Sequence, residues 1–195
     1  MNSETGHEDF HTLILGIGNL LWADEGFGIR AMEQLHRRYE MPAGVRFLDG
    51  GTQGIFLLPW IRVAPRLLIF DAIDFGLEPG SLRVIRDDDV PRYMGAKKVS
   101  MHQTGFQEVL ATARLLEGNP RRLALVGVQP HTLDDFGGSL TPVVREGVAA
   151  AVAAAVGVLE EWGSMPAPRR NPLPDTELTG PGALEQAVYE LRPAG

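Results

Sequence analysis

Near its start the chain carries three successive features that together limit what it can fold into. Residues 12–17 form an apolar run, Gly16, Gly18 and Asn19 mark a turn, and the adjacent carboxylates Asp24 and Glu25 precede a segment with helical periodicity. Open α/β sheets build their sites where buried strands deliver polar side chains at their carboxyl ends. The stretch therefore predicts a strand–turn–helix unit of an α/β sheet, with a candidate site at the carboxyl edge.

The glycines of this turn also suggest a dinucleotide-binding loop, but the match is incomplete. A G-x-G-x-x-G fingerprint that starts at Gly16 needs a third glycine where the chain has Leu21. The fingerprint also requires an acid about 20 residues downstream. The first acid that ends a following strand pattern is Asp49, which lies 33 residues after Gly16. A nucleotide-binding enzyme is therefore the less favoured alternative.

Strand and helix patterns alternate through the body of the chain. The strand patterns cover residues 12–17, 45–48, 66–73, 81–86 and 123–128, and the helix patterns cover 26–39, 55–63, 102–116 and 141–162. The acidic, Pro-containing segment between residues 86 and 102 is expected to be a loop. Strands separated by helices need crossover connections, which give a mostly parallel sheet with helices on both faces. We therefore expect a three-layer α/β fold built on a twisted sheet.

The two ends of the chain differ from this body. Residues 1–11 are polar and acidic and lack the pattern of a secretory signal. Residues 163–195 hold six of the 14 prolines, which disfavours continued regular structure. We expect a flexible extension at 1–11, a single α/β domain at 12–162 and a Pro-rich tail at 163–195. Within that tail, residues 183–191 could form a short amphipathic helix.

Charge and composition exclude several classes of function. A formal net charge of −7 argues against binding nucleic-acid phosphates, which requires clustered Lys and Arg. The chain has no cysteine, so it forms no disulfide and offers no thiolate as a metal ligand or nucleophile. The longest apolar run, residues 147–159, is too short to span a bilayer. We expect a cytoplasmic monomer with no nucleic-acid or membrane partner.

Three polar side chains fall where strand patterns end or helix patterns begin: Glu25, Asp71 and His102. In a parallel sheet these points lie on one edge, so the side chains can converge although they are 46 and 31 residues apart in sequence. Two carboxylates and an imidazole suit a borderline divalent ion such as Ni²⁺, Zn²⁺ or Fe²⁺. Three protein ligands also leave positions open for water or substrate, as in a catalytic site.

Each of these residues also has a plainer interpretation. Glu25 could complement the positive end of the helix that it precedes, and His102 could simply open its helix. Asp71 is harder to explain in this way, because a carboxylate at the end of a buried strand destabilises the fold unless it is paired or liganded. We interpret Asp24 as a helix cap, since Asp is a favoured capping residue. The glycine-rich segment 49–54 could bind a peptide or form a tight turn.

Four segments, in order, carry a resemblance to a known family. They are residues 16–28 (GIGNLLWADEGFG), 49–54 (DGGTQG), 71–72 (DA) and 100–105 (SMHQTG), followed by residues 125–130 and 140–142. With these motifs the chain resembles the maturation endopeptidases of nickel–iron hydrogenases. These enzymes trim the C-terminus of the hydrogenase large-subunit precursor after nickel insertion. The resemblance covers residues 12–162.

The resemblance implies a function and a set of site residues. Glu25, Asp71 and His102 would be both the metal-contacting and the catalytic residues, on a twisted sheet flanked by helices. The nickel would be supplied by the precursor, whose cysteines hold it, so that cleavage tests metal insertion. A non-enzymatic, nickel-dependent chaperone of the same precursor is the alternative. The nucleophile could be a metal-activated water or one activated by a carboxylate, as in aspartic proteases. The expected substrate-binding residues are Asp49, Gly50, Gly51 and Thr52.

Overall fold

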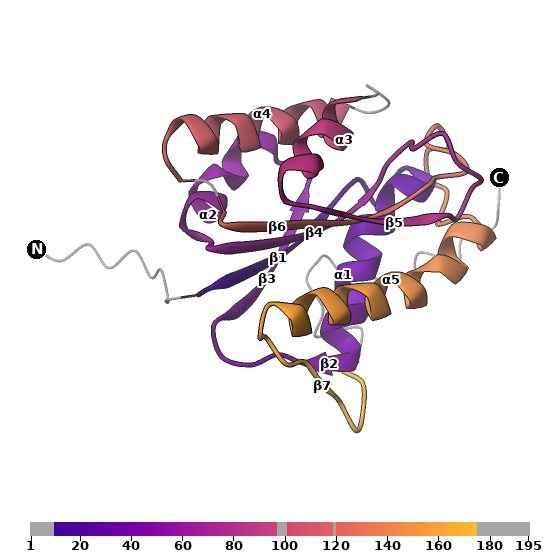
Figure 1. Cartoon of the computed structure of the whole chain (residues 1–195). Helices are drawn as coiled ribbons and strands as arrows, with labels where there is room; N and C mark the ends of the chain where they lie inside the picture. Colours follow the sequence, from indigo (N-terminus) through magenta and orange to yellow (C-terminus); the bar gives the residue numbers. More distant parts are fainter. Residues whose placement is uncertain (1–9, 97–100, 119, 175–195) are drawn as a thin grey trace, which may run out of the picture.

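The computed structural model describes residues 10–96, 101–118 and 120–174, with the backbone alone for 94–96 and 101–105. A five-stranded sheet separates two layers of helices (Figure 1). The longer elements are β1 (Thr12–Ile17), α1 (Phe27–Arg38), β3 (Val45–Gly51), α2 (Leu58–Val63), β4 (Arg66–Ala72), β5 (Leu82–Arg86), α3 (Val90–Ala96), α4 (Met101–Leu115), β6 (Arg122–Val128) and α5 (Pro142–Glu161). The short ones are η1 (Ala23–Gly26), β2 (Tyr39–Glu40), η2 (Gly54–Leu57), η3 (Asp87–Asp89) and β7 (Ala167–Pro168).

The sheet has the strand order β3-β1-β4-β6-β5. The first four strands are parallel, and β5 runs antiparallel to β6 at one edge. The link from β4 to β5, residues 73–81, contains no helix, so β5 enters the sheet in the reverse direction. The predicted three-layer, mostly parallel α/β fold is confirmed.

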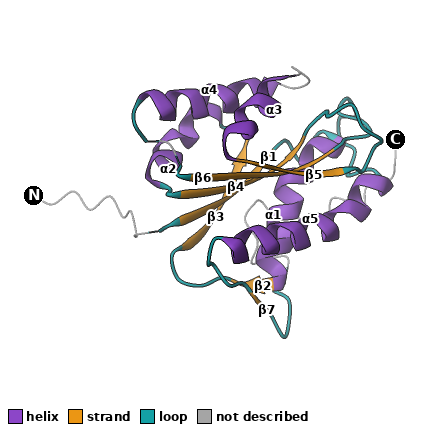
Figure 2. Ribbon diagram, viewed as in Figure 1, coloured by secondary structure: helices purple, strands orange, loops and turns teal. Residues whose placement is uncertain are grey.

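Alternation along the buried strands divides the core into two clusters. In β4, Leu68 and Phe70 pack with α1 and α5, whereas Leu67 and Ile69 pack with α2 and α4. Figure 2 shows the sheet between these two sets of helices, with α3 beside α4. Side chains of both faces are fully buried, as expected for parallel strands covered on both sides.

The acidic segment between β5 and α4, predicted to be a loop, contains η3 and α3 instead. Val90, the first residue of α3, is fully buried and joins the cluster beneath α4. The prediction was wrong because three aspartates and Pro91 are typical of loops. Proline is nevertheless well tolerated in the first turn of a helix, where its missing N–H would have no partner.

By length and composition, α5 is the one helix in the described ranges that could cross a membrane. A buried helix of a globular core passes the same test. In this fold α5 lies against the sheet and α1, and its stripe Val144, Val148, Val152 and Leu159 is part of the core. Packing within the domain therefore accounts for the apolar face that α5 turns toward the sheet and α1.

The beginning of the Pro-rich tail lies against the end of α1. β7 pairs with β2 in a separate two-stranded sheet, in antiparallel register. The N–H of Arg169 donates to the carbonyl of Arg38 (2.8 Å), and the N–H of Leu173 donates to that of Arg37 (3.0 Å). These bonds occupy carbonyls that the end of a helix leaves without intrahelical partners. The possible helix at 183–191 lies outside the described residues.

Two truncations test how much the tail contributes to stability. Ending the chain after Pro174 keeps every contact described here, so we expect an unchanged melting temperature. Ending it after Trp162 removes the bonds to Arg37 and Arg38; we expect a folded core, but an unfolding free energy lower by about 2 kcal/mol. Equal urea denaturation midpoints for the two truncated proteins would contradict this expectation.

Candidate active site

Glycines let the amino end of α1 lie directly against the ends of β1 and β4. A Cβ atom at Gly28 would overlap the carbonyl oxygens of Ile17 and Phe70. One at Gly18, whose φ is +136°, would overlap the carbonyl oxygen of Glu25. A Cβ at Gly16 would lie 2.8 Å from the carbonyl oxygen of Gly28. Gly16 and Gly18, which suggested a dinucleotide-binding loop, are therefore required by close backbone packing.

Glu25 lies in η1, immediately after the turn that follows β1. Its N–H donates to the carbonyl of Trp22 (2.9 Å), and its own carbonyl accepts from the N–H of Asn19 (3.2 Å). The Asn19 side chain in turn accepts a bond from the N–H of Leu21 (3.0 Å). These bonds fix the backbone of Glu25, whose half-buried side chain lies at the carboxyl edge of the sheet.

Asp71 lies near the end of β4, the strand next to β1. It is fully buried and pairs with Gly127 of β6 in the ladder. Its position in the alternation matches Ile69 and Ile73, which pack with α4. The carboxylate of Asp71 therefore lies on the α4 face of the sheet, at the same edge as Glu25.

His102 is the second residue of α4. This helix ends at Leu115, and the chain soon enters β6 at the amino edge of the sheet. A helix of 15 residues spans about 22 Å, so α4 begins at the opposite, carboxyl edge. The side chain of His102 lies outside the described part of the structure. The backbone thus brings the three predicted positions to one edge.

Among the side chains that the structure describes, no group of three or more His, Cys, Asp or Glu forms a metal site. Because His102 is not among those side chains, the predicted trio of Glu25, Asp71 and His102 falls outside this test. The roles of these residues as metal ligands and catalytic groups stay predictions.

Asp24 does not act as the predicted helix cap. Its fully buried carboxylate reaches across to the segment between β6 and α5. Oδ2 accepts from the N–H groups of His131 (2.9 Å) and Thr132 (3.1 Å), and Oδ1 from the N–H of Thr141 (2.7 Å). The hydroxyl of Thr141 also donates to this carboxylate, at 3.0 Å from either oxygen, instead of capping α5. Asp24 thus ties the loop that carries Glu25 to residues 131–141.

The substitution Asp24→Asn tests this network. The amide nitrogen of the asparagine would take the place of Oδ1 or Oδ2, and in either place it would face at least one backbone N–H donor. We therefore expect a loss of about 3 kcal/mol in the free energy of unfolding. Urea denaturation monitored by circular dichroism measures it. Asp134→Asn, at an exposed position in the same loop, is the control and should change stability by less than about 0.5 kcal/mol. Equal stability of the two variants would contradict the importance of the network.

The predicted substrate-binding residues lie at the end of β3: Asp49, Gly50 and Gly51 are its last three residues, and Thr52 follows them. The Asp49 carboxylate accepts from the N–H of Gly51 (2.9 Å), whose φ of +43° suits glycine. Gly50 is buried, and a Cβ there would lie 2.9 Å from the Leu15 side chain. Only Thr52 of the four predicted residues is exposed. The turn therefore presents mainly its backbone and Thr52 to the surface.

Asp49 also has an unusual electrostatic environment. Burial raises the pKa of this carboxyl above its ordinary value, while the Gly51 N–H and the charge of Arg30 act in the opposite direction. Arg30 itself is buried in α1 and pairs with Glu33 at 2.9 Å. Neither Arg30 nor Glu33 was singled out in the sequence, because charged residues on a helix are usually exposed.

The substitution Asp49→Asn tests whether burial or the attraction to Arg30 dominates at this carboxyl. The amide oxygen keeps the bond from Gly51, and the desolvation of an ionised carboxylate disappears. Because the folded-state pKa is raised, the folded state of the native protein loses stability as pH rises through that pKa. We expect the variant to be the more stable protein at neutral pH, with no difference below the ordinary pKa of 3.8. Thermal melts across this range measure it. Lower stability of the variant at neutral pH would show that attraction to Arg30 dominates.

Gln129, which lies in the segment 125–130 of the family resemblance, shapes the loop that follows Asp71. Its side-chain oxygen accepts from the N–H groups of Phe75 (2.8 Å) and Leu77 (3.1 Å). Its side-chain nitrogen donates to the Asp74 carboxylate at 3.1 Å. This nearly buried amide thereby holds residues 74–77 in place beside the candidate site.

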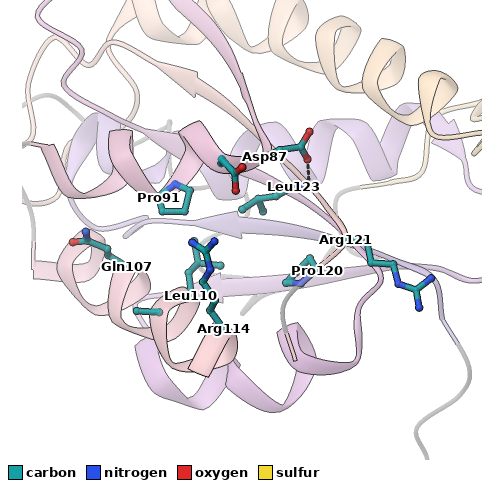
Figure 3. Close-up of a pocket in the computed structure, with 10 residues that line it drawn as sticks. Asp87, Pro91, Gln107, Leu110, Arg114, Pro120, Arg121 and Leu123 are labelled. Atoms are coloured by element: carbon teal, nitrogen blue, oxygen red, sulfur yellow. Dashed lines mark hydrogen bonds between the residues drawn. The ribbon is translucent and has the colours of Figure 1, made fainter. Parts of the chain in front are cut away.

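A pocket of about 340 Å³ lies at the amino edge of the sheet, where β6 begins (Figure 3). It is lined by η3, by the second half of α4 and by the start of β6, with Arg114 extending over it. Asp87 turns away from its centre, and its carboxylate accepts from the N–H of Leu123 (2.9 Å). This pocket lies at the edge opposite Glu25 and Asp71.

Comparisons with known proteins agree with the fold and the motifs. A family model described as hydrogenase maturation protease matches residues 29–158. The hydrogenase expression/formation protein HupD of Bradyrhizobium diazoefficiens is 53% identical over 190 residues, which cover 97% of this chain and 99% of that protein. The hydrogenase 2 maturation protease of Escherichia coli is 39% identical over 158 residues, which cover 80% and 95% respectively.

The solved structures give the same result. The hydrogenase maturating endopeptidase HybD from Escherichia coli has a TM-score of 0.78 and 38% identity, over 82% of this chain and 98% of that one. The resemblance inferred from the motifs is thus confirmed, and so is the endopeptidase class of hydrolase. The chain belongs to the hydrogenase maturation protease family.

Proposed function

We propose that this endopeptidase removes the C-terminal peptide from the nickel-loaded precursor of a nickel–iron hydrogenase large subunit, using Glu25, Asp71 and His102. Family membership supports the reaction class and the precursor as substrate. The observation that carries the choice of residues is the position of Glu25 in η1, after β1, and of Asp71 near the end of the adjacent parallel strand β4, at the edge where α4 begins.

The donor set fits recognition of a metal ion that arrives with the substrate. Two carboxylates and an imidazole form a partial site, and without a thiolate they do not select nickel. The precursor would supply the remaining ligands through its own cysteines. A precursor without nickel would then lack the ion that joins it to the enzyme, so cleavage would follow metal insertion.

The surroundings of the two carboxylates suggest different tasks. The backbone of Glu25 is fixed by hydrogen bonds at a half-buried position, where its side chain can meet a bound polypeptide. Asp71 is fully buried on the α4 face, where its negative charge favours a nearby cation. A divalent ion bound there would polarise the scissile carbonyl or lower the pKa of a water. In the aspartyl-protease alternative, a carboxylate takes the proton of the attacking water.

The experiment compares nickel-loaded with nickel-free precursor. We expect the native enzyme to shorten only the loaded precursor, as measured by intact mass, and the purified enzyme alone to hold little metal. A tightly bound zinc ion that supports cleavage of nickel-free precursor would contradict the proposal. Release of an uncut, nickel-loaded precursor would indicate the chaperone alternative, which the family's protease members do not favour.

Two substitutions test the assigned residues. Glu25→Gln keeps the shape of the side chain but removes its charge, and His102→Ala removes the imidazole. We expect each to lower cleavage of the loaded precursor by at least about 100-fold, with an unchanged circular dichroism spectrum. The exposed residue His131 provides the control, since His131→Ala keeps the backbone N–H that bonds Asp24. Near-native cleavage by either site variant would remove that residue from the active site.

A further inference from the structure

An exposed aromatic pair lies beside the candidate active site. Trp22, in the loop before Glu25, and Phe136, between β6 and α5, meet edge to face with ring centroids 5.3 Å apart. Trp22 is half-buried, while Phe136 is 67% exposed. Scattered exposed apolar residues are normal on protein surfaces, so this pair needs a further reason to be considered functional.

That reason is the rigid support of both rings. The two segments form an antiparallel bridge at Trp22 and Phe136. On either side of it, the N–H of Gly137 donates to the carbonyl of Leu21 (2.7 Å), and the N–H of Ala23 donates to that of Gly138 (3.1 Å). These bonds hold the solvent-exposed ring of Phe136 in a fixed position. Such pre-organised aromatic groups are typical of binding sites, because little conformational entropy is lost on binding.

The pair is also directly connected to the candidate active site. The carbonyl of Trp22 accepts the N–H of Glu25 (2.9 Å). Asp24, between these two residues, bonds the N–H groups at both ends of the loop that carries Phe136. A polypeptide that reaches Glu25 therefore passes close to the two rings.

We propose that Trp22 and Phe136 form a docking site for an apolar side chain of the hydrogenase large-subunit precursor, close to its cleavage site. This inference rests on the proposed function, which places the scissile bond at Glu25. The occupant is a polypeptide segment, since the substrate of an endopeptidase extends on both sides of the bond that is cut.

Charge on the same loop indicates what accompanies that apolar residue. Asp134 and Asp135 directly precede Phe136, and both are exposed. An acidic surface beside an apolar one favours a segment in which basic residues neighbour the apolar side chain. The basic neighbours would mainly speed association, whereas the ring contact would supply affinity.

The test measures steady-state cleavage of nickel-loaded precursor by the full-length enzyme. Phe136→Ser should raise KM about tenfold, the equivalent of roughly 1.4 kcal/mol of lost contact, with kcat within about twofold of the native value. Phe136→Leu, which keeps an apolar side chain, should restore much of the affinity. Leu115→Ser is the matched control, because Leu115 is 84% exposed at the far end of α4; its KM should not change.

A binding measurement separates this inference from the proposed function. In the Glu25→Gln background, Phe136→Ser should weaken binding of the loaded precursor about tenfold in a titration. If the native enzyme cleaves the precursor but Phe136→Ser leaves KM and binding unchanged, the docking site is wrong and the proposed function stands. A fall in kcat alone would also overturn it, since Phe136 would then act by positioning Glu25. If the native enzyme cleaves no precursor, the proposed function itself fails.

Discussion

The buried carboxylate of Asp24 is the interaction on which the carboxyl edge of this fold depends. It accepts hydrogen bonds from three backbone N–H groups and one hydroxyl. All four donors belong to the segment between β6 and α5, more than 100 residues away in sequence. A buried charge is tolerated when such donors surround it. The candidate catalytic residue Glu25 is next in the chain, so its position depends on this link.

The parallel strands give two further carboxylates opposite surroundings. Asp71 shares its side of the sheet with Ile69 and Ile73 and faces α4. Asp49 follows Phe47, which packs with α1, by two residues, and it feels the charge of Arg30 in that helix. Side chains along a strand alternate between the two faces of the sheet. Asp71 and Asp49 can therefore lie at the same edge and face different helices. This explains how Asp71 can face α4 while Asp49 lies near Arg30 of α1.

The sequence predicted most of the fold, because buried strands and amphipathic helices have clear periodicities. It also predicted that Glu25 and Asp71 would share an edge, since parallel strands make that a consequence of topology. It missed α3, because three aspartates and a proline are typical of loops. It misassigned Asp24 as a helix cap, because a local role was the only one that neighbouring residues suggested. The partners of Asp24 and Gln129 are distant in sequence, and no local pattern identifies such contacts.

The features that the sequence did not predict have a common physical character. The bonds of Asp24 and Gln129 and the buried Arg30–Glu33 pair place polar groups in the interior, where apolar side chains of similar size would often serve stability as well. Polar groups, unlike apolar ones, fix directions as well as distances. These polar groups hold the loop before Glu25, the loop after Asp71 and the helix that faces Asp49. An endopeptidase that acts on a large protein substrate needs these loops in one arrangement, and directional bonds in the interior provide it.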